Sequence, residues 1–334
     1  MWQRVAFTPP TPAWQKELSE CITDAADLLQ LLDLPRSLGM AARDAAKSFP
    51  VRVPRSFVAR MERGNRHDPL LLQVLPLDRE QNDVSGFTPD PVGDLAARTE
   101  TGLLHKYQGR ILAIATGACA VHCRYCFRRH FPYSEHSLSR GAWTEALDHI
   151  HRDASVHEVI LSGGDPLTLA DAKLTELVRS LAAIPHVRRL RVHTRLPVVV
   201  PSRITRELVT ALTATRLAPV MVIHANHANE LDTSVHAALK MLRECHVTLL
   251  NQSVLLRGIN DDADTLAALS ERLFECGVMP YYLHALDRVA GAAHFDLDDD
   301  RTHALYHDLQ ARLPGYLVPK LVREEAGAKF KTPL

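Results

Sequence analysis

The chain has 334 residues, of which 46% are apolar and 23% are charged, as expected of a globular protein with either one barrel and extensions or two domains. The 39 basic and 39 acidic residues cancel, so net charge gives no reason to expect a nucleic-acid or membrane-surface partner. No apolar run reaches the length of a membrane span, and the amino terminus lacks a signal peptide's apolar stretch, so we expect a cytoplasmic protein.

The first hundred residues are predicted to be mainly helical. Apolar residues recur at helical spacing from Thr11 to Leu32, and a second helical segment is predicted from Arg36 to Lys47. The stretch from Arg79 to Gly93 is polar and contains two prolines and two glycines, which is typical of a linker or a long loop.

From about Arg110 the pattern changes, because short β-rich runs alternate with amphipathic helical stretches. Such a series predicts a parallel sheet with helices outside it, either an open doubly wound sheet or a full or partial barrel. The predicted strands are Ile111–Thr116, Glu158–Leu161, Leu190–His193, Val220–His224, Thr248–Gln252 and Met279–Leu283, and the predicted helices lie at about 140–152, 171–183, 203–213, 230–244 and 262–276.

Polar residues and glycines directly follow most of the predicted strands, at Ser162–Asp165, His193–Arg195, His224–Asn226, Asn251–Ser253 and Asp287. The carboxyl ends of parallel strands are where such folds place ligands and chemistry. Loops after strands are polar in any case. The repetition of these clusters nevertheless favours a barrel with a functional site at its mouth.

Three of the six cysteines lie in one segment, CAVHCRYC from Cys119 to Cys126, directly after the first predicted strand. In a reducing compartment such a cluster indicates a metal site rather than disulfides, and thiolates select iron–sulfur clusters or zinc. Structural zinc needs four ligands, so zinc would require His122, His130 or Cys245 as the fourth. Three thiolates on a four-iron cluster instead leave one iron open. A non-catalytic zinc or cluster protein is the alternative to an enzyme.

The C-x3-C-x2-C spacing resembles the radical S-adenosylmethionine (SAM) superfamily, in which Cys119, Cys123 and Cys126 would hold a [4Fe–4S] cluster whose open iron binds SAM. Further stretches resemble the lysine 2,3-aminomutase family within that superfamily. Before residue 100 the best match is Asp68–Pro76. From residue 100 onward the matching stretches are spread over most of the chain: Leu104–Arg110, Cys126–Arg129, Leu161–Leu167, Val192–Val199, Asn251–Leu256, Pro280–Tyr282 and Lys331–Pro333.

The resemblance implies an α/β fold, a partial TIM-like (β/α)6 radical SAM barrel with a helical amino-terminal region and a short carboxyl-terminal closing segment. The expected divisions are residues 1–99, 100–300 and 301–334. The implied reaction converts L-α-lysine to β-lysine. The chain ends soon after Pro333, which favours the branch that supplies β-lysine to a lysyl ligase acting on elongation factor P. An aminomutase for another amino acid, such as arginine, is the nearest alternative.

The family also implies pyridoxal 5′-phosphate, because an amino group cannot migrate between adjacent carbons as a simple radical and needs an imine through which to pass. Lys331 matches the lysine that holds this cofactor as a Schiff base, with Lys329 as a competitor. Arg110 matches an arginine that contacts the phosphate, where a guanidinium suits bidentate binding. Lys106 and Tyr107 are further candidates for that pocket.

The substrate would be held at both ends. Arg128 matches the residue that clamps the α-carboxylate, and Asp287 matches an acid that receives the ε-ammonium. Glu324 lies where the best-studied members carry a second such acid, an aspartate, so the depth of the pocket is expected to differ. The segment Ala326–Phe330 also departs from the glycine-rich run of the long-chain members.

The remaining cofactor contacts are expected from the ends of neighbouring strands. Glycine there would permit a close backbone approach to SAM. The residues expected to border SAM or the second cofactor are Ser162, Gly163, Gly164, Asp165 and Gln252, with His193, Arg195 and His224 as further contacts. The family also suggests a homo-oligomer.

Overall fold

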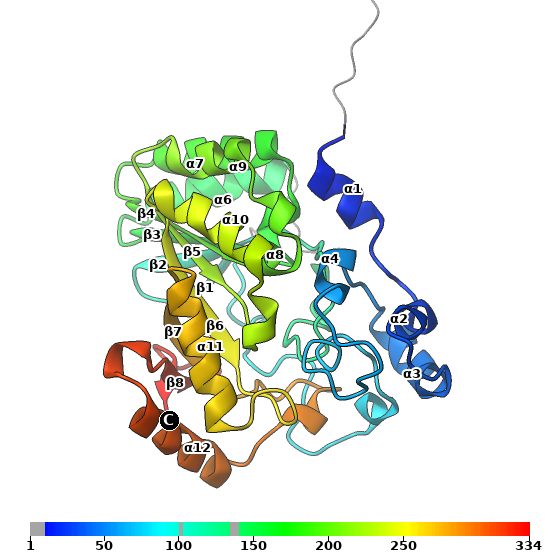
Figure 1. Ribbon diagram of the computed structural model, residues 1–334. Coiled ribbons are helices and arrows are strands. Elements are labelled where there is room, and N and C mark those ends of the chain that lie inside the picture. The colour runs from blue at the N-terminus through cyan, green and yellow to red at the C-terminus, as the bar shows by residue number, and fades with distance from the viewer. Residues whose placement is uncertain (1–10, 100–102, 134–139) are drawn as a thin grey trace, which may run out of the picture.

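The computed structural model describes residues 11–99, 103–133 and 140–334 and shows an α/β architecture built on one sheet (Figure 1). Strands β2 to β8 are parallel neighbours, while β1 and β9 pair antiparallel at the two edges. No pairing of β1 with β9 closes the sheet among the described strands, so the fold is the predicted partial barrel. The strands are β1 (Leu103–Tyr107), β2 (Arg110–Thr116), β3 (Glu158–Gly163), β4 (Arg189–Thr194), β5 (Ala218–Ile223), β6 (Thr248–Val254), β7 (Met279–His284), β8 (Lys320–Arg323) and β9 (Thr332–Pro333).

One long helix connects each pair of successive parallel strands and lies on the outer face of the sheet (Figure 1). Acidic caps start several of them: Asp232, Asp262 and Asp298 each accept a backbone N–H from the first turn, which satisfies a donor that the helix itself leaves unpaired. No described helix is long and apolar enough to cross a membrane. The connecting helices are α6 (Arg140–Arg152), α7 (Asp171–Ala182), α9 (Arg206–Thr213), α10 (Thr233–Glu244), α11 (Ala263–Glu275) and α12 (Asp299–Arg312), with a short α8 (Leu196–Val199) after β4.

The six predicted strands and five predicted helices of the barrel are confirmed, with small shifts at their ends. The structure adds a seventh parallel strand, β8, which follows α12 and pairs with β7. This strand has only two apolar residues, Leu321 and Val322, and both are buried. A run so short carries no periodicity, so its place in the sheet comes from its neighbours.

The amino-terminal region contains α1 (Ala13–Ser19), α2 (Ala25–Leu31), α3 (Ser37–Ser48) and α4 (Arg55–Val58). The single helical stretch expected from residue 11 to residue 32 is therefore wrong. Ile22 leaves the helix to exchange backbone hydrogen bonds of 2.8 and 2.9 Å with Val53. Asp24 then caps α2 by accepting from Ala26 N at 2.6 Å. A partner distant in sequence thus breaks a pattern that is locally helical.

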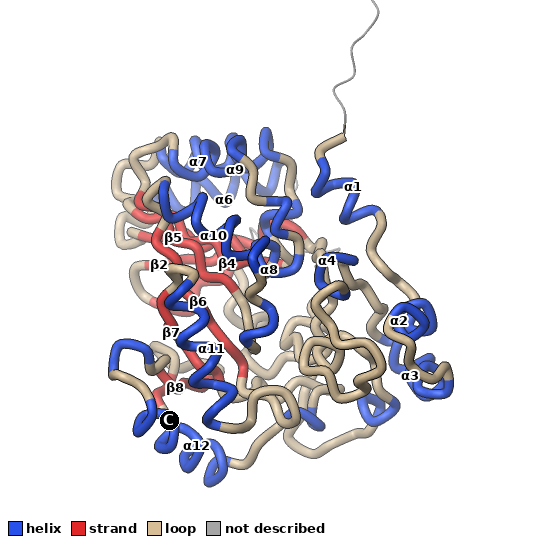
Figure 2. The backbone as a smooth tube through the Cα atoms, viewed as in Figure 1, coloured by secondary structure: helices blue, strands red, loops and turns tan. Residues whose placement is uncertain are grey.

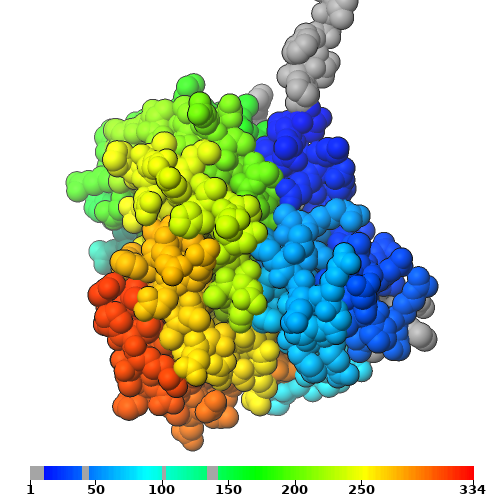
Figure 3. All heavy atoms as spheres, in the orientation of Figure 1, coloured from blue at the N-terminus to red at the C-terminus, as the bar shows by residue number. Residues whose placement is uncertain are grey.

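Between α4 and β1 the chain is mainly loops and turns (Figure 2), with one 3₁₀ turn, η1 (Asp78–Gln81). The region packs along one flank of the barrel (Figure 3). Arg124 N donates to Gln73 O at 2.9 Å, and Ser56 Oγ donates to Val199 O at 2.6 Å. These bonds join it to the loops after β2 and β4. The other 3₁₀ turns are η2 (Pro166–Thr168), η3 (Pro201–Arg203), η4 (Ala228–Glu230), η5 (Ala293–Phe295) and η6 (Gly315–Leu317).

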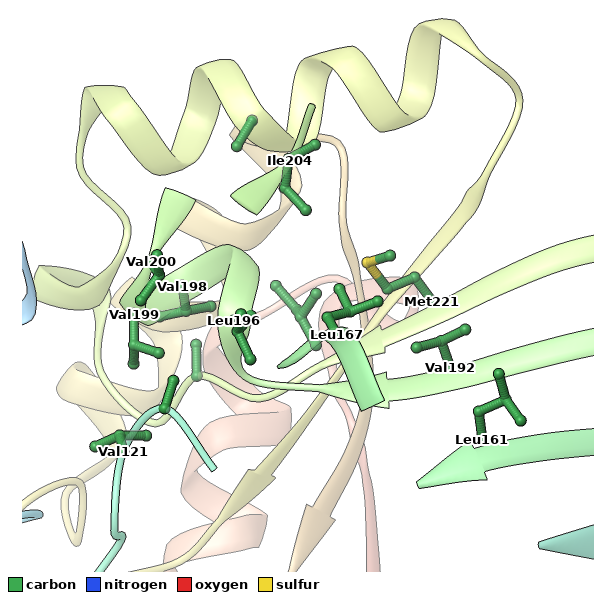
Figure 4. Packing of buried hydrophobic residues seen from close by; sticks show 14 of the residues in the cluster. Val121, Leu161, Leu167, Val192, Leu196, Val198, Val199, Val200, Ile204 and Met221 are labelled. Atoms are coloured by element: carbon green, nitrogen blue, oxygen red, sulfur yellow. The ribbon is translucent and has the colours of Figure 1, made fainter. Parts of the chain in front are cut away.

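The main hydrophobic core lies between the sheet and its helices (Figure 4). Leu161, Val192 and Met221 contribute to it from three neighbouring strands, and Val198 contributes from α8. Val121, between the cysteines of the loop after β2, belongs to the same cluster and is 6% exposed. Burying such a side chain stabilises the fold by about 1.5–3 kcal/mol, so the cysteine loop is fixed to the barrel by its own apolar residue.

Candidate active site

One cavity of about 460 Å³ opens at the carboxyl ends of the parallel strands. The sheet brings these positions together because the strands are parallel and their ends share one mouth. The residues that the resemblance assigns to the cluster, the cofactors and the substrate all line this cavity: Cys119, Cys123, Cys126, Arg110, Arg128, Ser162, Gly163, Gly164, Asp165, Gln252, Asp287, Glu324 and Lys331. Lys329, the competitor of Lys331, is exposed and lies outside the lining.

The cysteine loop follows β2 and presents three free, partly buried thiols to the cavity. Cys126 N donates to Cys123 O at 3.0 Å, which closes the turn between them. Burial, together with the nearby Cys123 sulfur, raises the pKa of Cys126 to about 11, and burial raises the pKa of Cys119 well above its ordinary value. Bringing such sulfurs to the thiolate form needs a cationic group in place of their protons, and an iron–sulfur cluster supplies one.

The zinc alternative finds no support in this geometry. Among the described residues no three His, Cys, Asp or Glu side chains converge on a point that could hold a single metal ion. His122 Nδ1 lies 2.8 Å from Pro50 O and His130 Nε2 lies 3.0 Å from Ala290 O, while Cys245 is exposed at the end of α10. A cluster spreads its ligands over several irons, so the three thiols fit it better than they fit one ion.

The glycines after β3 allow the backbone of this strand to approach the cysteine loop closely. Gly164 N donates to Thr116 O at 2.7 Å. A Cβ on Gly164 would lie 2.3 Å from Ala118 O, and one on Gly163, whose φ is +126°, would lie 2.4 Å from Thr116 O. The close approach that glycine was expected to permit is therefore to the chain's own loop. Contact of these residues with SAM remains a prediction.

Asp165 is buried and fully engaged within the protein. Its Oδ1 accepts from Thr194 Oγ1 at 2.7 Å, and its Oδ2 accepts from Arg195 N at 2.7 Å. Burial raises the pKa of this carboxyl to about 6. The side chain ties the loop after β3 to the loop after β4, so its position at the cavity has a structural reason beside the predicted cofactor contact.

A chain of alternating charges crosses the cavity, and we call it the cavity charge chain: Arg128, Asp94, Lys106, Glu324 and Lys331. Arg128 Nε donates to Asp94 Oδ2 at 2.6 Å, and Lys106 Nζ lies 2.5 Å from Asp94 Oδ1. Lys106 Nζ also donates to Glu324 Oε1 at 3.1 Å, and Glu324 Oε2 accepts from Lys331 Nζ. The chain joins the cysteine end of the cavity to the carboxyl-terminal segment.

Both acids of this chain are held as carboxylates. Burial alone would raise the pKa of Glu324, but Lys331 and Lys106 lower it to about 2. Burial would likewise raise the pKa of Asp94, yet Arg128 and Lys106 together hold it below its ordinary value. Lys106, a further candidate for the phosphate pocket, thus pairs with two carboxylates.

Asp287 and His193 also line the cavity, and each has a buried side-chain atom with no hydrogen bond to the described residues. Asp287 Oδ1 is buried without a hydrogen bond, and burial raises the pKa of this carboxyl to about 7. His193 Nε2 is also buried without a partner, and burial lowers the pKa of this imidazole far below its ordinary value. Buried polar atoms are usually satisfied, so a buried acid and an imidazole of this kind at a cavity are suited to bind a polar ligand.

Aromatic rings and arginines line the part of the cavity near Lys331. The Arg110 guanidinium lies 4.5 Å from the centre of the Tyr107 ring and has no hydrogen bond or ion pair to the described residues. Lys331 Nζ lies 5.9 Å from the centre of the Tyr282 ring. Arg191 also lines the cavity and pairs with Glu158. Free arginine donors beside a lysine amine and flat rings fit a phosphorylated aromatic aldehyde.

The further contacts proposed on β4 to β6, namely His193, Arg195, His224 and Gln252, all lie in the lining. His224 Nε2 lies 3.1 Å from Tyr125 OH. Sequence reasoning missed Asp94, Gln73 and Glu230. All three are fully or almost fully buried. Their partners are distant in sequence. Gln73 lies in the matched stretch Asp68–Pro76, but nothing in the local pattern indicates that it, Asp94 or Glu230 is buried.

Comparisons with known proteins identify the relatives of this chain. The chain matches the Radical SAM superfamily over residues 113–269. It is 49% identical over 328 residues to "L-lysine 2,3-aminomutase" of Escherichia coli (strain K12), covering 98% of this chain and 96% of that protein. The chain is also 49% identical to the protein of that name from Haemophilus influenzae, covering 96% of this chain and 94% of that protein. It is 32% identical to the one from Clostridium subterminale, covering 96% of this chain and 77% of that protein.

Proposed function

Because the chain belongs to the L-lysine 2,3-aminomutase family of the radical SAM superfamily, we propose that it converts L-α-lysine to β-lysine with a [4Fe–4S] cluster, SAM and pyridoxal 5′-phosphate. The observation that carries the proposal is the meeting, in one cavity, of three thiols, a lysine amine and an unpartnered buried acid. When bound, the cluster and SAM supply a hydrogen-abstracting radical, and pyridoxal phosphate supplies the conjugation through which an amino group can pass between adjacent carbons.

The chain's residues would hold these groups at opposite ends of the cavity. Cys119, Cys123 and Cys126 ligate the cluster. Lys331 presents its amine to the aldehyde of pyridoxal phosphate, while Glu324 holds Nζ in place. Arg110, whose donors are unpaired among the described residues, binds the phosphate.

Arg128 is arranged to receive the substrate carboxylate. Asp94 holds its Nε at 2.6 Å, and Ser162 Oγ accepts from its Nη1 at 3.1 Å. These bonds fix the plane of the guanidinium, and Nη2 has no partner among the described residues. A carboxylate bound there would lie beside the cysteine loop, near the source of the radical.

The ε-ammonium of lysine matches Asp287. An ammonium at Asp287 Oδ1 would supply the partner that the carboxyl lacks and would favour its charged form. Glu324 is already bonded to Lys106 and Lys331, so it contributes as a second, longer-range negative charge. An arginine substrate would also suit these acids, whereas a glutamate side chain would be repelled.

The test is an anaerobic assay of the protein reconstituted with iron and sulfide, with SAM, pyridoxal phosphate, a strong reductant and either L-lysine or L-arginine. We expect β-lysine, detected by chiral mass spectrometry, only when both cofactors are present. Formation of β-arginine alone would show that arginine, and not lysine, is the substrate. Absence of 5′-deoxyadenosine on an intact cluster would contradict the enzymatic proposal.

Two variants separate the proposed roles. Cys126→Ala should abolish SAM cleavage, because the cluster loses a ligand. Lys331→Ala should form no β-lysine but retain some uncoupled cleavage, because the cysteine end of the cavity is intact. Equal loss of 5′-deoxyadenosine in both variants would contradict separate sites.

We further propose that the β-lysine is passed to a lysyl ligase that modifies elongation factor P. The support is the sequence resemblance and the high identity, over nearly both whole chains, to the Escherichia coli protein. Mass spectrometry of elongation factor P incubated with the ligase and the product tests this. Modification by α-lysine in preference to the product would contradict it. A cytoplasmic homo-oligomer stays a prediction.

A further inference from the structure

Arg195 is a buried guanidinium that contacts a cysteine of the cysteine loop. It follows β4, is 6% exposed, and its Nη1 donates to Cys123 Sγ at 2.7 Å. Its backbone N–H is held by Asp165 Oδ2 at 2.7 Å. The backbone and the side chain are thus both fixed, and a charged N–H donor is aimed at a sulfur that would ligate the cluster.

Glu230 and Gln73 determine where this guanidinium points. Arg195 Nη2 donates to Glu230 Oε2 at 2.9 Å and to Gln73 Oε1 at 2.5 Å. Glu230 is fully buried, and its Oε1 accepts from Gln73 Nε2 at 3.0 Å and from Asn226 N at 2.8 Å. A guanidinium is planar and rigid, so fixing Nη2 on one side directs Nη1 toward Cys123.

We propose that Arg195, positioned by Glu230 and Gln73, raises the reduction potential of the [4Fe–4S] cluster by donating a charged hydrogen bond to the Cys123 thiolate. Reduction adds an electron to a cluster that its thiolates already make anionic. A cationic donor at one of those sulfurs stabilises the reduced state more than the oxidised one. The interaction is strong because the site is buried and poorly screened.

The neighbouring acid acts in the opposite direction. Arg195 and Glu230 form a buried ion pair at 2.9 Å, so their long-range fields largely cancel, and the local N–H dipole at the sulfur remains. Neutralising Glu230 leaves the arginine charge unbalanced beside the cluster. The two residues therefore have opposite predicted effects on the potential, which a purely structural role would not produce.

The experiment measures the midpoint potential of the reconstituted cluster by anaerobic spectroelectrochemistry without SAM, with the reduced cluster quantified by electron paramagnetic resonance. Arg195→Lys keeps the buried charge but loses the planar guanidinium that bonds Glu230 and Cys123 at the same time. Arg195→Gln combined with Glu230→Gln removes both charges. We expect each to lower the ratio of reduced to oxidised cluster about tenfold at a fixed potential, a shift of about 59 mV to more negative values. Glu230→Gln should shift the potential in the positive direction.

A matched control removes an arginine–carboxylate pair from the exterior. Arg312 Nη1 lies 3.0 Å from Asp264 Oδ1, and both side chains are exposed. Arg312→Gln combined with Asp264→Asn should leave the potential unchanged.

The proposal rests on cluster ligation by the three cysteines and not on the identity of the substrate. Measured iron and sulfide contents distinguish a failure of cluster ligation from a failure of the role of Arg195. If the wild type binds no cluster, the ligation itself fails. If Arg195→Lys and Glu230→Gln carry full clusters at the control's potential, the role of Arg195 is overturned. Opposite shifts in these two single variants support it even where the double variant fails to fold.

Discussion

At the scale of single residues, the cavity is organised by pairs of opposite charge and by Asp287, an acid with no hydrogen bond from its Oδ1 to the described residues. Asp94 illustrates this best, because it is almost fully buried and bonded to both Arg128 and Lys106. Removing one partner from such a buried pair is costly because the other charge is left uncompensated. Asp94 is therefore a positioning residue for the guanidinium that we assign to the substrate carboxylate.

Asp94→Asn should release Arg128 from its fixed plane. Charge-assisted hydrogen bonds contribute about 1.5–3 kcal/mol, so we expect KM for L-lysine to rise at least about tenfold, with a smaller effect on kcat. Steady-state kinetics measures this. The control is Asp83→Asn, at an exposed position in the loop that follows η1. An unchanged KM would remove Asp94 from the substrate site.

Asp287 should impose a pH dependence on stability. Its folded pKa of about 7 exceeds the ordinary value of about 4, so the folded state holds the proton more tightly. Its contribution to stability is therefore full below about pH 4 and declines until about pH 7. In the cofactor-free protein, Asp287→Asn should melt at progressively higher temperature than the wild type as pH rises through this window. A constant difference in melting temperature would contradict the assignment.

At the scale of elements, the barrel follows from the sequence more closely than the amino-terminal region does. In that region the helix predicted from Arg36 to Lys47 is confirmed as α3, whereas the stretch from Thr11 to Leu32 is divided. Each predicted parallel strand contains buried apolar residues and lies between helical stretches, so the local β–α alternation identifies it. The break between α1 and α2 depends on Val53, and β8 depends on β7. Such pairings are set by tertiary contacts, so periodicity alone could not predict them.

The junction between β3 and the cysteine loop gives a prediction at this scale. In Gly164→Ala the new Cβ would meet Ala118 O at 2.3 Å. The Cβ position is fixed by the backbone of residue 164 and Ala118 O is a backbone atom, so neither can rotate away. We expect a loss of more than about 2 kcal/mol of folding free energy and reduced iron content. Gly258→Ala, where no atom lies within 4 Å of the new Cβ, controls for glycine replacement although its φ of +77° adds strain. Equal iron binding in both variants would contradict the close approach.

At the scale of the whole molecule, the amino-terminal region holds the cysteine loop in place. Glu80 of η1 is buried and accepts from Arg124 Nη2 at 2.5 Å and from Arg129 Nη2 at 2.8 Å. The stretch expected to be a linker or long loop thus supplies a carboxylate for two arginines that flank Cys126. The predicted boundary near residue 100 stays a prediction, but the contacts across it are buried and charged.

Glu80→Gln should leave two buried arginines without a counter-charge. We expect a loss of about 3 kcal/mol or more in the free energy of unfolding, and a cluster that is lost faster to chelators. Denaturant titration and iron release measure these effects. Glu244→Gln, which removes an exposed partner of Lys240, should cost less than about 1 kcal/mol. Similar losses in both variants would contradict a clamp by Glu80.

The sequence identified residues that line the cavity better than it identified the residues that support them. Cys119, Arg128 and Lys331 belong to motifs, and their meeting follows once the strands are known to be parallel. Asp94 and Glu230 belong to no motif, and their importance comes from partners across the fold. Burial and long-range pairing are properties of the tertiary structure, and a single sequence does not display them.

The cavity charge chain gives the two ends of the cavity a common electrostatic balance. A ligand that reacts with the Lys331 ammonium removes a cation from Glu324. The ion pair between Lys106 and Glu324 then becomes stronger, and the ion pair between Lys106 and Asp94 becomes weaker. Asp94 then binds Arg128 more tightly, and the affinity of Arg128 for an anion changes. Heterotropic coupling of this kind is reciprocal by thermodynamic necessity. Occupancy at the cysteine end must therefore alter the affinity at Lys331 by the same factor.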